Sequence, residues 1–401
     1  MRRVSRDWCL WSVLLLVACA PVGQAPLQRN YSHLLARGIH RGLPGMWLAA
    51  GTVDELAWAG AAGLSRLEGT VDAELDDRVH MGSITKAFTA VVALQLIGEG
   101  RLGLDDPVTA HLSDELVGPI PHSEEITVGQ LLDHTSGIYG FNNDLRYLRG
   151  LLGREAGEPR SWAPADLVAL AYEGVNEPFG RPGERPRYGD TNYVLLGLVL
   201  ESVTGESLQT AVRERILEPL GLEATTYLLS PPAGGDALPP DRAAGYFHVS
   251  DELRSVSEFH PKFRRVRDDL LRTTEAGETI TAAAALLTTA PDLFRFGRAL
   301  FGGELLGDSV QGRLLAVADG LDAAPVGTER LGILRAYRKP YGVVVTSEGD
   351  GPGGSNSLLA YHPATGVVVA VLTNVHGLGF ESRFFLDEVV AEVVRSFELP
   401  G

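Results

Sequence analysis

The segment Met81-Gly82-Ser83-Ile84-Thr85-Lys86-Ala87-Phe88 begins a long apolar stretch that continues to Gly100. Its apolar residues recur with a helical period, so the segment predicts a buried helix. Ser83 and Lys86 are three residues apart and would lie on one face of that helix. A serine hydroxyl becomes a nucleophile when a neighbour takes its proton, and a lysine held neutral by its surroundings can do so.

Lysine is rare in this chain. Only Lys86, Lys262 and Lys339 occur among the 35 basic residues, so arginine is the usual positive charge. Arginine stays protonated in proteins and cannot serve as a base. A lysine at this place favours a deprotonatable amine, although the spacing alone also fits a structural lysine on a core helix.

Composition and charge restrict the class of protein. The chain has 401 residues, of which 45% are hydrophobic and 21% charged, as in globular proteins of one large or two closely packed domains. Its formal net charge is −16, so it offers no basic surface with which to bind nucleic acid.

The N-terminus has the pattern of a secretory signal peptide. Arg2, Arg3 and Arg6 precede an apolar run that is too short to span a bilayer. Leu16-Val17-Ala18-Cys19 resembles a bacterial lipobox, in which the cysteine is lipidated and becomes the mature N-terminus. We therefore expect a signal peptide over residues 1–18, a tether over 19–30, and a lipid on Cys19 that holds an exported protein on a membrane surface of the bacterial cell envelope. The alternative is a simple signal that is cleaved near Ala20.

Strand patterns lie at both ends of the chain. Residues 45–50 and 56–61 predict a hairpin, and residues 343–345, 357–362 and 367–373 are β-rich. Helical patterns fill most of the middle, and we expect further helices over 282–299, with a break near Pro291, and over 384–397. This order predicts an α/β fold of the α+β kind, with one sheet built from about 31–104 and 275–401 and an all-helical insert at about 105–274.

Three later motifs make a resemblance specific. They are Leu131-Leu132-Asp133-His134-Thr135-Ser136-Gly137, Tyr188-Gly189-Asp190-Thr191-Asn192-Tyr193 and Glu218-Pro219-Leu220-Gly221-Leu222. Together with Ser83-x-x-Lys86, they occur in the order seen in the class C β-lactamase family, which also contains D-alanyl-D-alanine carboxypeptidases, D-aminopeptidases and esterases. The resemblance implies a β-lactamase/transpeptidase-like antiparallel sheet flanked by helices over residues 31–401.

The resemblance also implies roles for particular residues. Ser83 resembles the acylated nucleophile, Lys86 its proton acceptor, and Tyr188 the group that moves protons to the leaving atom. The oxyanion hole would use the N–H of Ser83 and a second N–H from the strand that carries the third motif of the family. Apart from the resemblance, the apolar neighbours Leu131 and Leu132 indicate that His134 is a structural hydrogen-bonding residue behind the site rather than a base.

The third motif differs from that of the family, which is usually Lys-Thr-Gly or His-x-Gly. Alignment on Pro352-Gly353 places Ser347-Glu348-Gly349 there, with the Asp350 N–H as the second oxyanion donor. The usual cation, which helps to position a substrate carboxylate, is missing. Glu348 would repel such a carboxylate if it faced the cleft, which weakens the case for a β-lactamase or carboxypeptidase.

Asp190 is a second difference, because the family usually has asparagine beside the lysine. An ionised carboxylate about 4 Å away favours the charged lysine by about 4 kcal/mol at an effective dielectric near 20. Four alternatives follow. Asp190 is protonated, or it points away, or Tyr188 takes the proton, or activity is low.

We therefore predict a serine hydrolase, esterase-like or amidase-like, that acts on a small-molecule or peptide/ester substrate. The alternatives are a β-lactamase or D-alanyl-D-alanine carboxypeptidase, and a non-catalytic envelope binding protein on the same fold. The sequence has no HExxH pattern and no cysteine pair, so we expect no metal and no cofactor. It also lacks a G-x-S-x-G elbow, which argues against an α/β-hydrolase.

Overall fold

A computed structural model describes most of the chain after the predicted tether. The described residues are 29–144, 146–147, 162–173, 176–227, 241–248, 264–267, 270–272, 282–319, 329–330, 334–351, 354–376 and 380–398. The predicted signal peptide with Cys19, nearly all of the tether, and Pro352-Gly353 lie outside these ranges. Within them, no helix combines the length and the apolar character needed to cross a membrane.

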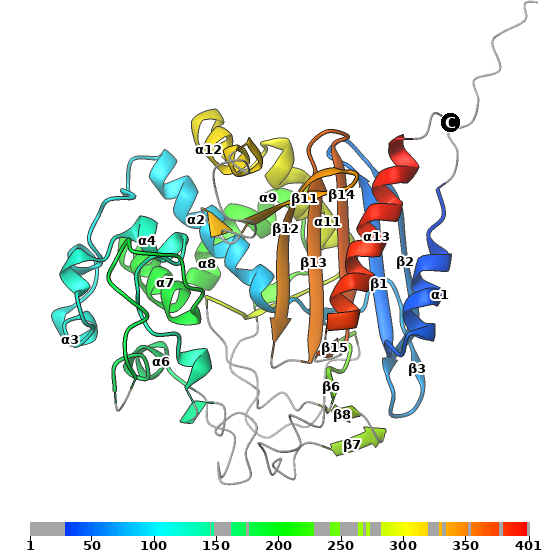
Figure 1. The fold of residues 1–401 in the computed structure, drawn as a ribbon, viewed down its shortest axis with the longest axis horizontal. Coiled ribbons are helices and arrows are strands. Elements are labelled where there is room, and N and C mark those ends of the chain that lie inside the picture. Colours follow the sequence, from blue (N-terminus) through cyan, green and yellow to red (C-terminus); the bar gives the residue numbers. More distant parts are fainter. Residues whose placement is uncertain are drawn as a thin grey trace, which may run out of the picture.

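An eight-stranded sheet forms the centre of the fold (Figure 1). Each neighbouring pair in it is antiparallel, and β1 pairs with β14 so that Trp47 lies opposite Leu372. The N-terminal and C-terminal parts of the chain therefore share one sheet, which confirms the predicted antiparallel architecture. In spatial order its strands are β10 (Glu329–Arg330), β11 (Leu334–Lys339), β12 (Gly342–Gly351), β13 (Ser355–His362), β14 (Val367–Thr373), β1 (Gly45–Thr52), β2 (Leu56–Arg66) and β3 (Val71–Asp72).

Helices cover both faces of this sheet, so the central strands are apolar on both sides. On one face α2 (Thr85–Gly98), α7 (Asp190–Thr204) and α11 (Ala290–Gly302) contribute to a large hydrophobic core. On the other face α1 (Ser32–His40) and α13 (Phe380–Glu398) pack together (Figure 1). All residues of β14 are buried, as this three-layer arrangement requires.

The middle of the chain is mainly helical and lies to one side of the sheet (Figure 1). It is not entirely helical, because it contains the short strands β5 (Thr226–Tyr227), β6 (Tyr246–His248), β7 (Arg264–Arg267) and β8 (Leu270–Arg272). β5 pairs with β9 (Leu286–Thr288) and β6 with β15 (Val375–His376), while β8 pairs with β6 and β7. Its helices and helical turns are η2 (Val108–Ala110), α3 (Asp114–Val117), η3 (Ser123–Glu125), α4 (Val128–Leu132), η4 (Phe141–Asn143), α6 (Pro164–Ala169), α8 (Leu208–Val212), η6 (Arg213–Leu217) and α9 (Glu218–Leu220).

The predicted helix over 282–299 is wrong in its first part. Residues of β9 form a strand that pairs with β4 (Val79–His80), and α11 begins only at Ala290, with Pro291 in its first turn and Thr289 as its N-cap. Proline suits a first helical turn because its missing N–H would have no partner there. Tertiary pairing decides the conformation of the apolar residues before it. Farther along, α12 (Asp308–Asp319) packs beside β11 and β12.

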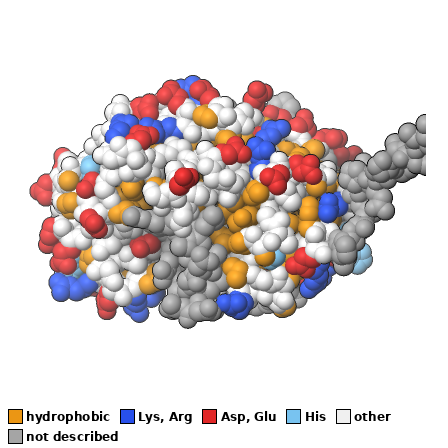
Figure 2. Space-filling model, turned by 90° about the horizontal axis from the view of Figure 1, so that it is seen from above, with side chains coloured by type: hydrophobic (Ala, Val, Ile, Leu, Met, Phe, Trp, Pro, Cys, Tyr) orange, Lys and Arg blue, Asp and Glu red, His pale blue; other side chains and the backbone are white. Residues whose placement is uncertain are grey.

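Carboxylate side chains are spread over the face seen in Figure 2, with basic side chains among them. This mixed distribution agrees with the acidic composition, which predicts no nucleic-acid surface.

Candidate active site

Ser83 lies on a short helical turn, η1 (Gly82–Ile84), immediately before α2 begins. The preceding residue, Gly82, has a φ of 55°, in the left-handed region. A Cβ on Gly82 would also lie 2.6 Å from the carbonyl oxygen of Asp350. Only glycine fits this position, because the turn crosses directly against β12.

Three of the predicted residues meet at this turn. The Nζ of Lys86 donates to the Oγ of Ser83 at 2.9 Å, and the Oγ of Ser83 lies 2.7 Å from the hydroxyl of Tyr188. The Lys86 side chain is fully buried. The structure therefore places the candidate nucleophile between an amine and a phenol, both within hydrogen-bond distance.

Lys86 is surrounded by oxygen atoms. Besides Ser83, its Nζ donates to the carbonyl oxygen of Ala283 at 3.0 Å and forms an ion pair with the Oδ1 of Asp190 at 2.9 Å. Two of these contacts are hydrogen bonds, and the third is an ion pair whose geometry does not make a hydrogen bond. The alternative in which Asp190 points away is therefore wrong.

The position of Asp190 depends on the segment that contains η4. The Asp190 N–H donates to the Oδ1 of Asn142 at 3.1 Å. The Oγ1 of Thr191 accepts from the Phe141 N–H at 3.0 Å and donates to the Tyr139 carbonyl at 2.9 Å. The start of α7, with its carboxylate, is thus attached to residues 139–142.

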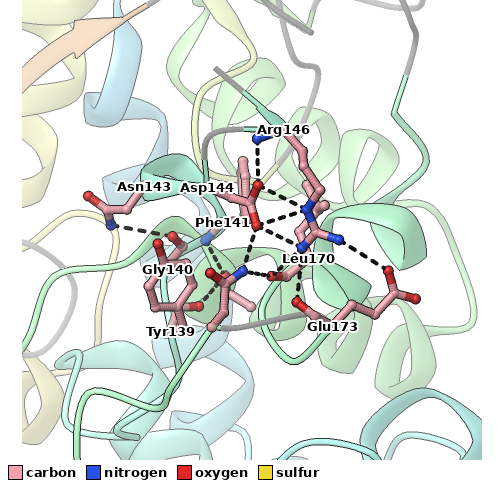
Figure 3. A network of polar contacts seen from close by, with 10 residues as sticks. Tyr139, Gly140, Phe141, Asn143, Asp144, Arg146, Leu170 and Glu173 are labelled. Carbon is pink, nitrogen blue, oxygen red and sulfur yellow. Dashed lines mark hydrogen bonds and ion pairs between the residues drawn. The ribbon is translucent and has the colours of Figure 1, made fainter. Parts of the chain in front are cut away.

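A polar network around the buried carboxylate of Asp144 holds this segment in turn (Figure 3). The Oδ2 of Asp144 accepts from the Nη2 of Arg146 at 2.7 Å and from the Nδ2 of Asn176 at 2.5 Å, and Arg146 also donates to the Glu173 carbonyl at 3.0 Å. Burial alone would raise the pKa of Asp144, but the hydrogen bonds from Arg146 and Asn176 outweigh it and lower the pKa to about 2.

His134 is buried behind Tyr188, with ring centroids 4.7 Å apart. Its Nδ1 lies 3.2 Å from the Nδ2 of Asn192 and accepts from the Gly189 N–H at 3.4 Å. Burial lowers the pKa of His134 well below its usual range, and the positive charges of Lys86 and Arg335 lower it further. The ring is therefore neutral, and its place agrees with the hydrogen-bonding role expected from its apolar neighbours Leu131 and Leu132.

The predicted third-motif strand is β12, and its backbone packs against the turn that carries Ser83. A Cβ on Gly349 would collide with the carbonyl oxygen of Met81 and lie 3.1 Å from the Ile84 nitrogen. Residues 347–351 pair with β13 on one edge, while the described part of β11 reaches only Thr346 on the other. Gly349 and Asp350 therefore lie beside Ser83, as the alignment of motifs predicted.

A cation near this motif was missed in the sequence. Arg335 of β11 lies with its Nη1 3.7 Å from the Oε2 of Glu348. Arg335 lies one strand before the motif in the sequence, and the pairing of β11 with β12 brings it close to Glu348. The residues of the motif therefore do not indicate that this cation is near. The Asp350 side chain is exposed, and the Ser347 side chain is fully buried, with an Oγ that makes no hydrogen bond to the described residues.

The remaining candidate sites can be stated briefly. Among the residues that the structure describes, no group of three or more His, Cys, Asp or Glu side chains could hold a metal ion. Cys19 lies outside the described ranges, so its predicted lipidation stays a prediction.

Comparison with known proteins identifies the family of this chain. A model of the Beta-lactamase family matches residues 27–391. Penicillin-binding protein 4 of Amycolatopsis lactamdurans is 29% identical over 330 residues, which cover 78% of this chain and 75% of that protein. The solved D-stereospecific amidohydrolase from Streptomyces sp. is 32% identical, with a TM-score of 0.68 over 86% of this chain and 93% of that chain.

A D-amino acid amidase from Ochrobactrum anthropi SV3, solved with L-phenylalanine, is 25% identical, with a TM-score of 0.72 over 91% of this chain and 96% of that chain. The family model alone spans far more than half of the sequence. The chain belongs to the Beta-lactamase family and is a serine hydrolase with the fold of that family.

Proposed function

We propose that this hydrolase acts by acyl transfer through Ser83 on an ester or amide substrate. The observation that carries the proposal is the position of the Ser83 Oγ, 2.9 Å from the Lys86 Nζ and 2.7 Å from the Tyr188 hydroxyl. A serine hydroxyl in this place has both a proton acceptor and a charge that stabilises the resulting anion. The Oγ attacks the substrate carbonyl, and the bond to the leaving group breaks as the acyl-serine ester forms.

Tyr188 is the proposed proton carrier. Lys86 already has three oxygen neighbours, so it serves best as an ammonium that stabilises the Tyr188 phenolate; its Nζ lies 4.9 Å from the centre of that ring. Tyr188 takes the Ser83 proton and gives it to the leaving oxygen or nitrogen. In deacylation, Tyr188 takes a proton from a water molecule that attacks the acyl-serine ester. Tyr188 then returns this proton to the Ser83 oxygen as the acid product leaves.

The proposed oxyanion hole consists of the backbone N–H groups of Ser83 and Asp350. Its support is the packing of Gly349 and Asp350 against the turn that carries Ser83. Loss of one such donor typically lowers the rate about 10²- to 10³-fold.

The substrate class follows from the charges. Glu348 is paired with Arg335, and the third motif itself has no cation, so the site favours an ester or amide without a required carboxylate. The relatives named as amidohydrolase and amidase agree with this preference. A β-lactamase or D-alanyl-D-alanine carboxypeptidase is the second candidate, because Arg335 could bind a substrate carboxylate if it separated from Glu348.

The protein is proposed to be exported and held on a membrane surface of the bacterial cell envelope by a lipid on Cys19. The signal pattern of residues 1–19 supports this location. Expression of the full chain and of Cys19→Ala in a bacterium, followed by fractionation and mass spectrometry of the N-terminal peptide, tests this. A diacylated Cys19 peptide supports the anchor, and an unmodified N-terminus near residue 21 overturns it.

A fluorescent fluorophosphonate followed by intact-mass analysis tests the nucleophile. We expect one adduct on the wild type and none on Ser83→Ala. Labelling that persists in Ser83→Ala rejects the assignment, and so does a wild type that is never labelled. A short-chain nitrophenyl ester, a D-amino acid amide and a chromogenic cephalosporin, compared by kcat/KM, then separate the two candidate substrate classes.

A further inference from the structure

His80 is a buried histidine to which the proposed mechanism gives no role. It lies on β4, two residues before Gly82, and is 5% exposed. Its Nδ1 accepts from the Gly82 N–H at 3.2 Å, and its Nε2 lies 3.3 Å from the carbonyl oxygen of Ala284. The ring therefore contacts the backbone next to Ser83, at Gly82, and the backbone next to the Lys86 acceptor Ala283, at Ala284.

These two contacts define a protonation state. A carbonyl accepts from Nε2 and an N–H donates to Nδ1, so the arrangement is satisfied by a neutral ring with its proton on Nε2. A doubly protonated ring would direct an N–H from Nδ1 at the N–H of Gly82. The hydrogen bond to the turn that carries Ser83 would then be lost.

Each contact stabilises a different part of the site. The Gly82 bond lies at the left-handed residue that directly precedes Ser83. The Ala284 bond holds the segment in which the Ala283 carbonyl accepts from Lys86 at 3.0 Å. The next two amides of that segment, from Ala285 and Leu286, each donate to the Thr85 Oγ1 at 3.2 Å.

We propose that neutral His80 is a positioning residue that fixes Ser83 and the Ala283 carbonyl relative to each other, and that protonation of its ring releases the turn before Ser83. This inference rests on the proposed function, because it takes Ser83 as the nucleophile. It adds a positioning residue, and a loss of activity at low pH, that the sequence motifs and the Ser83–Lys86 pair do not predict.

Burial, with a smaller contribution from the charge of Arg242, keeps the His80 ring neutral at ordinary pH. Arg242 is buried, Arg78 is paired with Asp241 at 2.5 Å, and Lys86 lies beyond the Ala283 carbonyl. Burial lowers the pKa of His80 to about 4, with Arg242 as the second cause. Release of the turn is therefore expected only near pH 4, on the acid side of the activity profile.

Two substitutions separate the two hydrogen bonds. In His80→Asn, the amide oxygen takes the place of Nδ1 and accepts from Gly82 without titrating. In His80→Gln, the longer side chain retains a donor toward Ala284 and loses the acceptor at Nδ1. His122→Asn is the matched control, because His122 is partly exposed immediately before η3, and asparagine tolerates its φ of 61°.

The measurements are kcat and KM for an ester substrate, and the rate of fluorophosphonate labelling, between pH 3.5 and 8. We expect His80→Asn to stay within about fivefold of the wild type at pH 7. It should keep the acid limb that Lys86 and Tyr188 set and lose only the additional fall that protonation of His80 causes near pH 4. His80→Gln should lose about 10- to 100-fold in kcat at pH 7, with KM nearly unchanged, because the nucleophile is misplaced. His122→Asn should match the wild type throughout.

Equal kcat in both His80 variants, or a fall near pH 4 that is as steep in His80→Asn as in the wild type, overturns the inference. If circular dichroism shows that either variant does not fold, the variant is replaced by an NMR titration of the ¹⁵N-histidine signals of the wild type, compared with its labelling rate at each pH. Labelling that falls with protonation of His80 supports the inference, and labelling that ignores it overturns the inference. A wild type labelled on Ser83 with unaffected His80 variants leaves the proposed function standing, whereas an unlabelled wild type removes both.

Discussion

The Nζ of Lys86 and the Oδ1 of Asp190 lie 2.9 Å apart behind the hydroxyl of Ser83. The lysine side chain has no solvent exposure, and that of Asp190 is 20% exposed, so water screens the pair weakly. A carboxylate in this position stabilises the ammonium form of its neighbour. It also neutralises the charge that would otherwise stabilise an anion on Tyr188. Asp190 thus limits both ways of activating Ser83.

Replacing Asp190 with asparagine should extend activity to lower pH. The neutral amide either lets Lys86 release its proton more easily or leaves its full charge to stabilise the Tyr188 phenolate. Both effects move the acid limb of the kcat/KM profile in the same direction, by roughly one to three pH units. Profiles of the wild type, Asp190→Asn and the exposed control Asp105→Asn measure this, and coincident profiles of all three would show that the pair is not coupled to the chemistry.

Charge changes beside β12 should alter substrate preference. Glu348→Gln removes the negative charge that lies 3.7 Å from the Nη1 of Arg335. We expect kcat/KM for a carboxylate-bearing ester to rise about five- to tenfold relative to its neutral analogue, as for removal of one charge at about 8 Å in a partly screened cleft. Arg335→Gln should shift the ratio the other way. The matched ester pair is the readout, and an unchanged ratio in both variants would place these side chains outside the substrate site.

A methyl group on Gly349 should disable the enzyme. Its Cβ would collide with the Met81 carbonyl beside Ser83, and such overpacking costs about 1–3 kcal/mol. We expect Gly349→Ala to lower the labelling rate at least about 100-fold and to lower the melting temperature. Gly312→Ala on α12, where a Cβ meets nothing within 4 Å, is the control and should be neutral or stabilising. Wild-type labelling in Gly349→Ala would contradict the close packing of β12 on the turn.

The network around Asp144 should stabilise the fold in a pH-dependent way. Its folded pKa of about 2 lies below the unfolded value of about 3.9, so its contribution is complete above pH 4 and is lost as pH falls towards 2. Asp144→Asn should lower the free energy of unfolding by about 2 kcal/mol at pH 7 and have little effect near pH 2. Urea unfolding at both pH values measures this, and a pH-independent difference would show that the carboxylate charge is not the cause.

Local motifs predicted the parts of the site that lie close together in the sequence or at the start of a helix. Ser83 and Lys86 are one helical turn apart, and Tyr188 and Asp190 directly precede the apolar run of α7, so periodicity and order located them. The antiparallel sheet was equally accessible, because the β-rich runs at both ends of the chain had no other partners of similar length.

Arg335, Ala283 and His80 could not be found in this way. Arg335 reaches Glu348 only through the pairing of β11 with β12. Ala283 contributes a backbone carbonyl, which has no signature in the sequence, and its segment was predicted as helix because strand pairing with β4 cannot be read from an apolar run. His80 differs from an ordinary core histidine only through its distance from Gly82 and Ala284.

The contacts around the nucleophile also set a temporal order. Ser83 bonds to a residue 105 positions later, Lys86 to one 197 positions later, and Met81 accepts from Ser357, 276 positions later. A chain that emerges N-terminus first contains the serine long before these partners exist. Closure of such long loops is slow compared with helix formation. Ser83 should therefore become reactive only in the last stage of folding. The rate at which covalent labelling of Ser83 appears during refolding would then report when folding is complete.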